Sequence, residues 1–195
     1  MRYQYLNSIH PLIDQYLDLF IKPDSIVIDA TLGNGHDSLK IAEKMDSSGA
    51  LYGFDIQESA IKNSHETLSR LPENRPRIEL IHDSHANFKA YISRPVDFII
   101  YNLGYLPKGD KTITTLAKST LESVQVGLEL LAGNGKMLIA VYHGHDSGKA
   151  EKAVLETYLK TLDQKHFHVF KQQFINQKND PPFIYLIEKA KTQVE

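Results

Sequence analysis

Short apolar runs rich in β-branched and aromatic residues alternate along the chain with longer stretches whose apolar residues recur at helical spacing. A short apolar run bounded by turn residues predicts a buried strand, and an apolar stripe with a period of about 3.6 residues predicts an amphipathic helix. The predicted strands are residues 26–29, 50–55, 78–82, 96–101, 136–141, 167–174 and 183–188. The predicted helices are residues 9–19, 37–45, 59–71, 86–91, 114–131 and 149–162.

This alternation predicts an α/β fold with a mostly parallel seven-stranded sheet and helices on both faces. The last two strands are separated by residues 175–182, too few for a crossover helix, so we expect them to pair antiparallel as a hairpin. The pattern has no linker, and we expect residues 1–195 to form one domain. We interpret the first helix as a packing helix; the alternative is that His10, at its start, reaches an active site.

Composition narrows the function. The 195 residues are 42% hydrophobic, and no apolar run approaches the length of about 20 residues that a membrane span needs. The first residues lack the pattern of a signal peptide, so we expect a soluble, cytoplasmic protein. With no cysteine, disulfides, thiolate metal sites and cysteine nucleophiles are excluded. A net charge of -2 predicts no overall attraction to nucleic acid, but a local basic patch remains open.

The strongest chemical signal is the segment 27–37, which reads Val-Ile-Asp-Ala-Thr-Leu-Gly-Asn-Gly-His-Asp. Its two glycines let the backbone approach a ligand beside the free N–H groups of a helix start. A dinucleotide fold would carry a third glycine where Ser38 stands, and Asp29 and Asp37 would repel a pyrophosphate. Two acids suit a ligand with a positive end, and S-adenosylmethionine carries both an ammonium and a sulfonium; the alternative is a tight turn without a ligand. The candidate cofactor residues here are Asp29, Thr31, Gly33, Asn34, Gly35, His36 and Asp37.

The second and third strands add candidates for the adenosine part of this cofactor. Asp55 ends the second strand 20 residues beyond Gly35, where adenosine-binding sheets place the carboxylate that accepts the ribose hydroxyls, and Gln57 lies beside it. The third strand ends at residues that could face the adenine or equally cap the following helix. They are Asp83, Ser84 and His85.

The segment 101–107, after the fourth strand, reads Tyr-Asn-Leu-Gly-Tyr-Leu-Pro. It resembles the Asn-Pro-Pro-Tyr signature of class I methyltransferases that act on exocyclic or primary nitrogens, with Leu103 and Gly104 in place of the prolines. The resemblance implies that the Asn102 side chain and an adjacent backbone carbonyl accept hydrogen bonds from the target nitrogen, while Tyr105 packs on the base or amine. The alternative is a structural strand-to-helix turn.

The resemblance extends over almost the whole chain. Segments 142–151 and 176–183, taken with 29–37, resemble the small bacterial family known as rRNA methylases. This implies a Rossmann-like class I methyltransferase fold with S-adenosylmethionine as cofactor. Family members are described as methylating the aminomethyl group of 5-aminomethyl-2-thiouridine at the tRNA wobble position, which gives the 5-methylaminomethyl form. Composition and spacing support a methyl-donor fold and do not choose tRNA over rRNA or a small molecule.

Methyl transfer from a sulfonium requires chiefly that an unprotonated nitrogen be aligned with the methyl carbon. Because an alkylammonium titrates near about 10.4, the pocket must favour the neutral amine, and Asn102 and the Leu103 carbonyl are the acceptor candidates. Tyr142 or His143 could assist proton removal, although no general base is defined. His143 and His145 also suggest a metal, but the pair lacks further ligands and the reaction needs none, so we expect no metal.

For an RNA substrate we expect contacts with the anticodon arm of tRNA from lysines near the Tyr105 loop and from asparagines of the final hairpin, which turn chemistry explains equally well. The candidate substrate-binding residues are Leu103, Gly104, Lys108, Lys111, Asn176 and Asn179. A homodimer is compatible with so small an RNA enzyme, but no interface can be inferred. Competing interpretations are a small-molecule N-methyltransferase, an NAD-dependent oxidoreductase, which Ser38 and the acids disfavour, and a non-enzymatic RNA-binding module.

Overall fold

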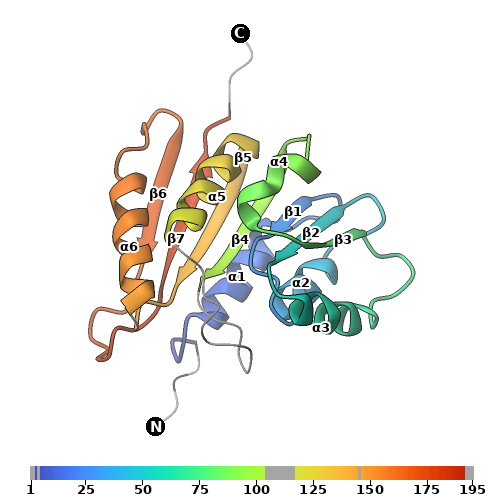
Figure 1. Ribbon diagram of the computed structural model, residues 1–195, viewed down its shortest axis with the longest axis horizontal. Coiled ribbons are helices and arrows are strands. Elements are labelled where there is room, and N and C mark those ends of the chain that lie inside the picture. The colour runs from blue at the N-terminus through green and yellow to red at the C-terminus, as the bar shows by residue number, and fades with distance from the viewer. Residues whose placement is uncertain (1–2, 4, 104–116, 145, 192–195) are drawn as a thin grey trace.

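The computed structural model describes residues 3, 5–103, 117–144 and 146–191. In these residues seven strands form one sheet in the order β3-β2-β1-β4-β5-β7-β6 (Figure 1). The strands are β1 Ile26–Asp29, β2 Ala50–Asp55, β3 Arg77–His82, β4 Val96–Leu103, β5 Leu131–Val141, β6 Phe167–Gln172 and β7 Phe183–Lys189. The run from β3 to β5 is parallel, and β7 pairs antiparallel with both β5 and β6. The predicted mostly parallel sheet with an antiparallel hairpin is confirmed.

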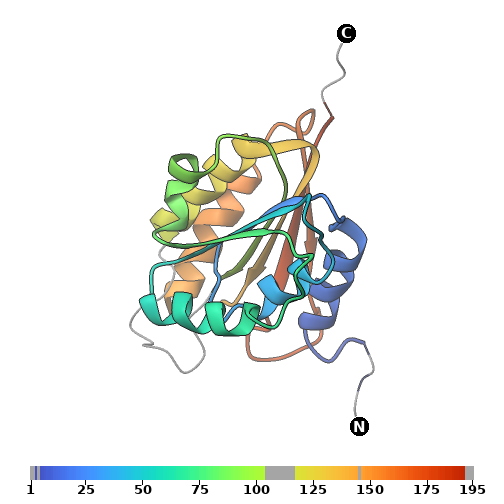
Figure 2. The same cartoon turned by 90° about the vertical axis from the view of Figure 1, so that its right-hand side faces the viewer.

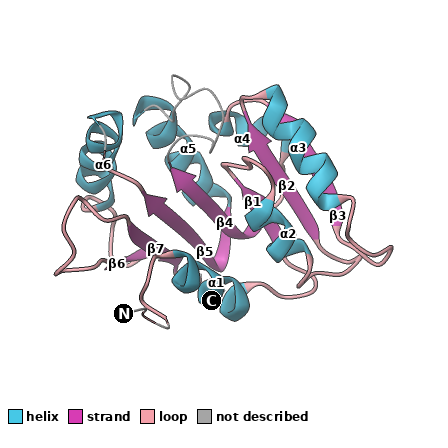
Figure 3. Ribbon diagram, turned by 90° about the horizontal axis from the view of Figure 1, so that it is seen from below, coloured by secondary structure: helices cyan, strands magenta, loops and turns pink. Residues whose placement is uncertain are grey.

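Helices cover both faces of the sheet. They are α1 His10–Phe20, α2 His36–Ala42, α3 Glu58–Leu68, the 3₁₀ helix η1 His85–Asn87, α4 Phe88–Tyr91, α5 Ala117–Leu130 and α6 Asp146–Leu159. Figures 2 and 3 show α1 on one side of the sheet and α4, α5 and α6 on the other. Helix α2 packs with α1 on its face, and α3 packs against α2, β2 and β3. Each described helix is too short or too polar to span a membrane.

The central strands are mostly apolar, and helices cover both of their faces. Successive residues of a strand point to opposite faces. In β4, Phe98 and Ile100 therefore pack in the core under α1 and α2, whereas Ile99 and Tyr101 pack in the core under α4, α5 and α6. The continuous apolar run that indicated a strand is thus the sequence signature of a strand buried on both sides.

Some predicted boundaries move, and the movement matters at β4. This strand continues through Asn102 and Leu103, so Asn102 is not in a loop after the strand but is held in the sheet opposite Ala140 of β5. Strand β5 begins at Leu131, earlier than predicted. Helix α2 ends at Ala42, and the Lys44 and Met45 amides bond to carbonyls three residues back, which tightens the chain into turns.

The order of the strands locates the ligand crevice. Strands β1 and β4 are parallel neighbours, yet their chain connections run to opposite sides of the sheet, since β1 leads to β2 and β4 leads to β5. Loops leaving the carboxyl ends of such a pair diverge and leave a crevice between them. The residues after β1 and at the end of β4 therefore face the same space.

The core on the α1 side gives a test of this packing. Leu138 in β5 is completely buried and pairs with Ile100 of β4. We expect Leu138→Ala to lower the free energy of unfolding by about 2–5 kcal/mol, since it removes buried methyl groups and leaves a cavity. Leu19→Ala in α1, at a side chain 67% exposed, is the control and should change it by less than about 0.5 kcal/mol. Urea denaturation measures both, and equal losses would contradict the burial of β5.

Candidate active site

The loop between β1 and α2 is docked on the end of β2. The Gly33 amide donates to Asp55 Oδ2 over 2.9 Å, and the Leu32 amide donates to the Phe54 carbonyl over 2.9 Å. Gly33 and Gly35 have left-handed backbones, with φ of 54° and 76°. Because this region is strained for residues with a side chain, the two glycines permit the loop to turn toward the carboxyl end of β2.

Gly35 has a second constraint, which comes from helix packing. A Cβ atom added to Gly35 would lie 2.9 Å from Ser64 Oγ of α3, so α2 begins in close contact with α3. Asn34 also ties the loop to α3, since its Oδ1 accepts from Asn63 Nδ2 over 2.9 Å, whereas His36 is exposed at the start of α2. Close packing against α3 is thus a second reason for glycine at position 35.

Asp29 is buried at the end of β1 and stabilises this loop through hydrogen bonds. It is 2% exposed, and it accepts hydrogen bonds from Ser38 Oγ over 2.7 Å and from the Thr31 amide over 3.2 Å. Burial raises the pKa of Asp29 to about 7, and the negative charges of Asp37 and Asp55 act in the same direction. Ser38, which stands where a dinucleotide fold has glycine, is thus the buried hydrogen-bond partner of this acid.

Asp55 lies at the rim of the loop and is only half-buried. Its Oδ1 accepts from the Gln57 amide and its Oδ2 from the Gly33 amide, each over 2.9 Å. Burial raises the pKa of this carboxyl although the backbone amides lower it. Each carboxylate oxygen has a further lone pair, so Asp55 can accept from two neighbouring hydroxyls. This is the donor set that a ribose offers, and the residue fits the adenosine part of S-adenosylmethionine.

The segment after β3 is built as a helix cap. Ser84 Oγ accepts from the Ala86 amide over 3.2 Å, and Asp83 accepts from the Ser84 amide and from Tyr91 Oη. His85 is buried with its ring edge-on to that of Tyr101, and burial lowers its pKa to about 4. His85 Nδ1 has no hydrogen-bond partner in the described residues, and the lowered pKa keeps the imidazole neutral near pH 7.

Asn102 is held by two hydrogen bonds to residues of the β1–α2 connection. Its backbone amide donates to Thr31 Oγ1 over 2.7 Å, and its side-chain Nδ2 donates to Asp37 Oδ2 over 2.8 Å. Its Oδ1 is buried and has no hydrogen-bond partner among the described residues. The sheet and the β1–α2 loop thus present one unsatisfied acceptor, and a buried acceptor without a partner is costly unless a ligand supplies the donor.

Tyr142 extends this cluster to helix α1. Burial and the negative charge of Asp37 raise the pKa of Tyr142 to about 12. Its hydroxyl lies 3.4 Å from Nε2 of His10, the first residue of α1. Helix α1 packs on the sheet as predicted, and its first residue also contacts Tyr142. Periodicity could not reveal this contact, because a helix start carries no signal for the distant strand that it meets.

His143 lies on the other face of the sheet from Tyr142. Its ring packs against Phe183 with centroids 5.2 Å apart, and its Nδ1 has no hydrogen-bond partner in the described residues. Burial, and then the charge of Lys152, lower its pKa. Tyr142 packs with the core on the α1 side and His143 packs against Phe183 of the other core, so the cluster of Asn102 includes Tyr142 and not His143.

Several predicted residues are not brought into this cluster. Asn176 and Asn179 are exposed in the β6–β7 connection, where Asn179 has a left-handed backbone with φ of 65°. Gly104, Tyr105, Lys108, Lys111 and His145 lie outside the described residues. Within the described ranges, no group of three or more His, Asp or Glu side chains could hold a metal ion.

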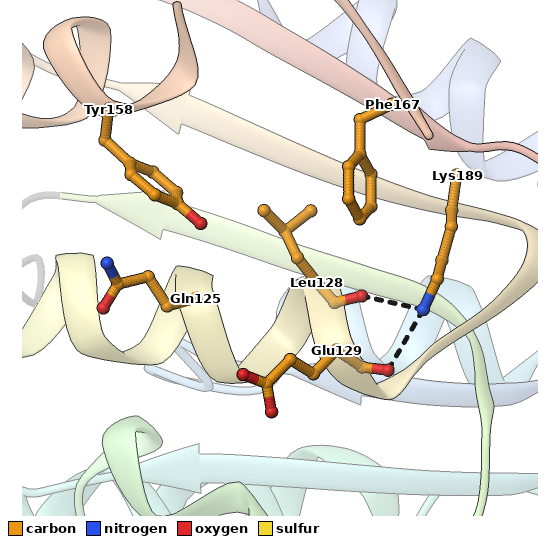
Figure 4. Close-up of a pocket in the computed structure, with 6 residues that line it drawn as sticks. All are labelled: Gln125, Leu128, Glu129, Tyr158, Phe167 and Lys189. Carbon is orange, nitrogen blue, oxygen red and sulfur yellow. Dashed lines mark hydrogen bonds between the residues drawn. The ribbon is translucent and has the colours of Figure 1, made fainter. Parts of the chain in front are cut away.

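A separate hollow of about 450 Å³ lies at the far end of α5 (Figure 4). Lys189 Nζ donates to the carbonyls of Leu128, Glu129 and Leu131. The two dashed lines of Figure 4 mark the bonds to Leu128 and Glu129. These are the last carbonyls of a helix and the next residue, so Lys189 caps α5. The hollow is a consequence of this cap at the amino-terminal end of β5, away from the crevice.

Comparison with known proteins identifies the family. The model of the family described as "Putative rRNA methylase" matches residues 51–188. The chain belongs to this family. A solved rRNA methylase of this description from Clostridium thermocellum is 37% identical, with a TM-score of 0.88, over 97% of this chain and 100% of that one. A Streptococcus mutans methyltransferase solved in complex with SAH is 35% identical, with a TM-score of 0.83, over 97% and 100% of the two chains.

Among curated proteins, a chloroplastic "tRNA (mnm(5)s(2)U34)-methyltransferase" from Arabidopsis thaliana is 28% identical over 87% of this chain. The chain spans 65% of the length of that relative. A ribosomal RNA small subunit methyltransferase H from Mycoplasmopsis pulmonis is 37% identical over 48% of this chain and 31% of its own length. The family and the fold assign S-adenosylmethionine as the cofactor, and the Asp55 carboxylate and the glycine loop fit it.

The buried Asp29 predicts a pH dependence of stability. Because its pKa in the folded protein, about 7, exceeds the unfolded value of about 3.9, the folded state binds the proton more tightly. The stability that protonated Asp29 contributes to the folded state is present near pH 4 and is lost as the pH rises to 7. Asp29→Asn removes this titration, while the amide can still bond to Thr31 and Ser38.

We therefore expect the free energy of unfolding of the wild type to fall, relative to that of Asp29→Asn, between pH 4.5 and about 7.5. Urea denaturation at several pH values measures this difference. The effects of the other titrating groups on the free energy of unfolding cancel, because both proteins contain them. A difference that is constant over this range would show that folding does not raise the pKa of Asp29.

Proposed function

We propose that this protein is an S-adenosylmethionine-dependent N-methyltransferase that methylates the aminomethyl group of 5-aminomethyl-2-thiouridine at the wobble position of tRNA. The observation that carries the proposal is the Asn102 side chain, whose Oδ1 is a buried acceptor without a partner in the described residues at the carboxyl end of β4. A primary amine supplies the N–H donor that this acceptor lacks.

The protein acts chiefly by positioning. When bound, S-adenosylmethionine supplies a methyl group on a good leaving group, so the N–C bond forms as the S–C bond breaks with its electron pair on sulfur. Asp55 and the Gly33–Gly35 turn hold the adenosine side of the crevice. Asn102 Oδ1 and the Leu103 carbonyl accept from the amine and direct its lone pair toward the methyl carbon.

The surroundings of Asn102 also favour the reactive protonation state. An amine in a crevice walled by buried residues loses water, and desolvation disfavours its ammonium form. Tyr142 adjoins this side of the crevice, and its raised pKa keeps it a neutral hydroxyl near neutral pH. Its contact with exposed His10 offers a route by which the proton released from the amine reaches solvent.

The choice of tRNA rests on the Arabidopsis relative, because that similarity extends over 87% of this chain. Contacts from Lys108, Lys111, Asn176 and Asn179 to the anticodon arm remain part of the proposal, as do the role of Tyr105 and a homodimeric assembly. The second candidate is an rRNA N-methyltransferase. It is favoured by the ribosomal RNA methyltransferases, which match about half of this chain.

The cofactor site is tested by Asp55→Asn. The amide offers one acceptor where the carboxylate offers two, so we expect the Kd for S-adenosylmethionine to rise at least about tenfold. Asp97→Asn is the matched control, because Asp97 Oδ2 also accepts a backbone amide, that of Ile26, but at the amino-terminal end of the sheet. Isothermal titration calorimetry measures both Kd values. Equal affinities of the two variants would place the ribose elsewhere.

The substrate is tested by incubating the protein with labelled S-adenosylmethionine and tRNA that carries 5-aminomethyl-2-thiouridine. Nucleoside mass spectrometry should find one added methyl on the aminomethyl side chain. We expect Asn102→Ala to lower kcat by about 100-fold or more while the Kd of the methyl donor stays unchanged, because it removes the acceptor that orients the amine.

Parallel reactions with ribosomal RNA and with free small amines separate the alternatives. Methylation of ribosomal RNA alone would replace the tRNA proposal by the second candidate, and methylation of free amines alone would indicate a small-molecule enzyme. Full turnover by folded Asn102→Ala would remove Asn102 from the mechanism.

A further inference from the structure

The proposed reaction requires the Asn102 side chain to face the substrate with its oxygen. The carboxamide by itself does not fix this orientation. A carboxamide has an acceptor oxygen and a donor nitrogen of nearly equal size, so rotation by half a turn exchanges them. With Oδ1 toward the substrate the side chain accepts from an amine, whereas with Nδ2 toward the substrate it repels the N–H groups. Some neighbouring group must select one orientation.

The neighbour that selects it is Asp37. Its Oδ2 lies 2.8 Å from Asn102 Nδ2. An ionised carboxylate is an acceptor only, so it bonds to the nitrogen of the amide and excludes the oxygen. The opposite atom, Asn102 Oδ1, is the one that is buried and lacks a partner in the described residues. The bond to Asp37 therefore determines which end of the amide is free.

Asp37 is itself held by the charge of Lys40 on its own helix, and Lys40 also pairs with Asp14 of α1. Lys40, one turn along α2, lies 3.8 Å from Asp37 Oδ1 and 2.6 Å from Asp14 Oδ1 of α1. Asp37 Oδ1 thus faces a cation while Oδ2 faces Asn102, and the two oxygens are not interchangeable. The Asn102 backbone is held independently by Thr31 Oγ1.

We propose that Asp37 is a positioning residue that fixes the Asn102 carboxamide with Oδ1 toward the substrate nitrogen, with Lys40 and Asp14 of α1 as its support. The inference rests on the proposed N-methyl transfer. It assigns to Asp37 a role different from that of a ligand for the ammonium of the methyl donor. As a ligand for the ammonium, Asp37 would determine the Kd of the methyl donor. As a positioning residue, it determines kcat.

The test is reciprocal exchange of the two side chains. In Asp37→Asn, two carboxamides can pair in either direction, so part of the population presents Nδ2 to the substrate; in Asn102→Asp, two carboxylates repel each other. We expect each variant to lower kcat by about 10- to 100-fold, with the donor Kd within about twofold of the wild type.

The double variant Asp37→Asn with Asn102→Asp restores the arrangement in mirror form. Asn at position 37 donates to one oxygen of Asp at position 102 and leaves the other oxygen to accept from the amine. We expect it to regain at least about tenfold in kcat over the poorer single variant, which independent effects cannot produce. A double variant no better than either single one, or a large rise in donor Kd for Asp37→Asn, would overturn the assignment.

A second measurement does not depend on activity. Side-chain amide signals of Asn102, identified by their absence in Asn102→Ala, are expected to show one proton shifted downfield by the carboxylate in ¹H–¹⁵N spectra. This shift should be lost in Asp37→Asn and kept in Asp18→Asn, a control whose acid in α1 pairs with Lys44 just after the end of α2. An unchanged shift in Asp37→Asn refutes the proposal. A lost shift in a protein that methylates no RNA amine refutes the proposed function alone.

Discussion

The parallel pairing of β1 with β4 is the constraint on which the site depends. Val27, Ile28 and Asp29 lie opposite Phe98, Ile99 and Ile100, and the ladder continues beyond β1 through the Ala30 amide, which donates to the Ile100 carbonyl over 2.9 Å. This register brings Thr31 beside the Asn102 backbone. A shift by one residue would turn every side chain of one strand to the other face. The β1–β4 register that buries the core side chains is therefore also the register that aligns the two sides of the crevice.

Buried acids around this pairing serve different tasks because their surroundings differ. Asp29 is enclosed and uses its oxygens on Ser38 and Thr31, so it shapes the loop. Asp55 is half-buried and bonded to backbone amides, so it keeps acceptor capacity toward a ligand. Asp37 is shared between Lys40 and Asn102. Burial raises the pKa of Asp29 to about 7, and the negative charges of Asp37 and Asp55 act in the same direction.

Helix α1 packs on the sheet and also contacts residues near Asn102. Its apolar face packs on β1, β4 and β5, while its polar residues His10 and Asp14 reach Tyr142 and Lys40. The other face of the sheet contributes little to this cluster, since His143 turns toward Phe183 and Lys152. The sheet thereby separates the neighbours Tyr142 and His143, which the linear motif presents as a pair.

The sequence by itself determined the order of strands and helices, the parallel architecture with its final hairpin, and the acids and glycines that end the strands at Asp29 and Asp55. These features depend on local periodicity and turn chemistry, which a linear pattern records. The tertiary structure alone decided that Asn102 stays within β4, that Asp29 is buried with Ser38, that Asp37 bonds to Asn102 and that His10 meets Tyr142. Such contacts join residues as far as 132 positions apart, and register and helix packing select them, for which one sequence carries no local signal.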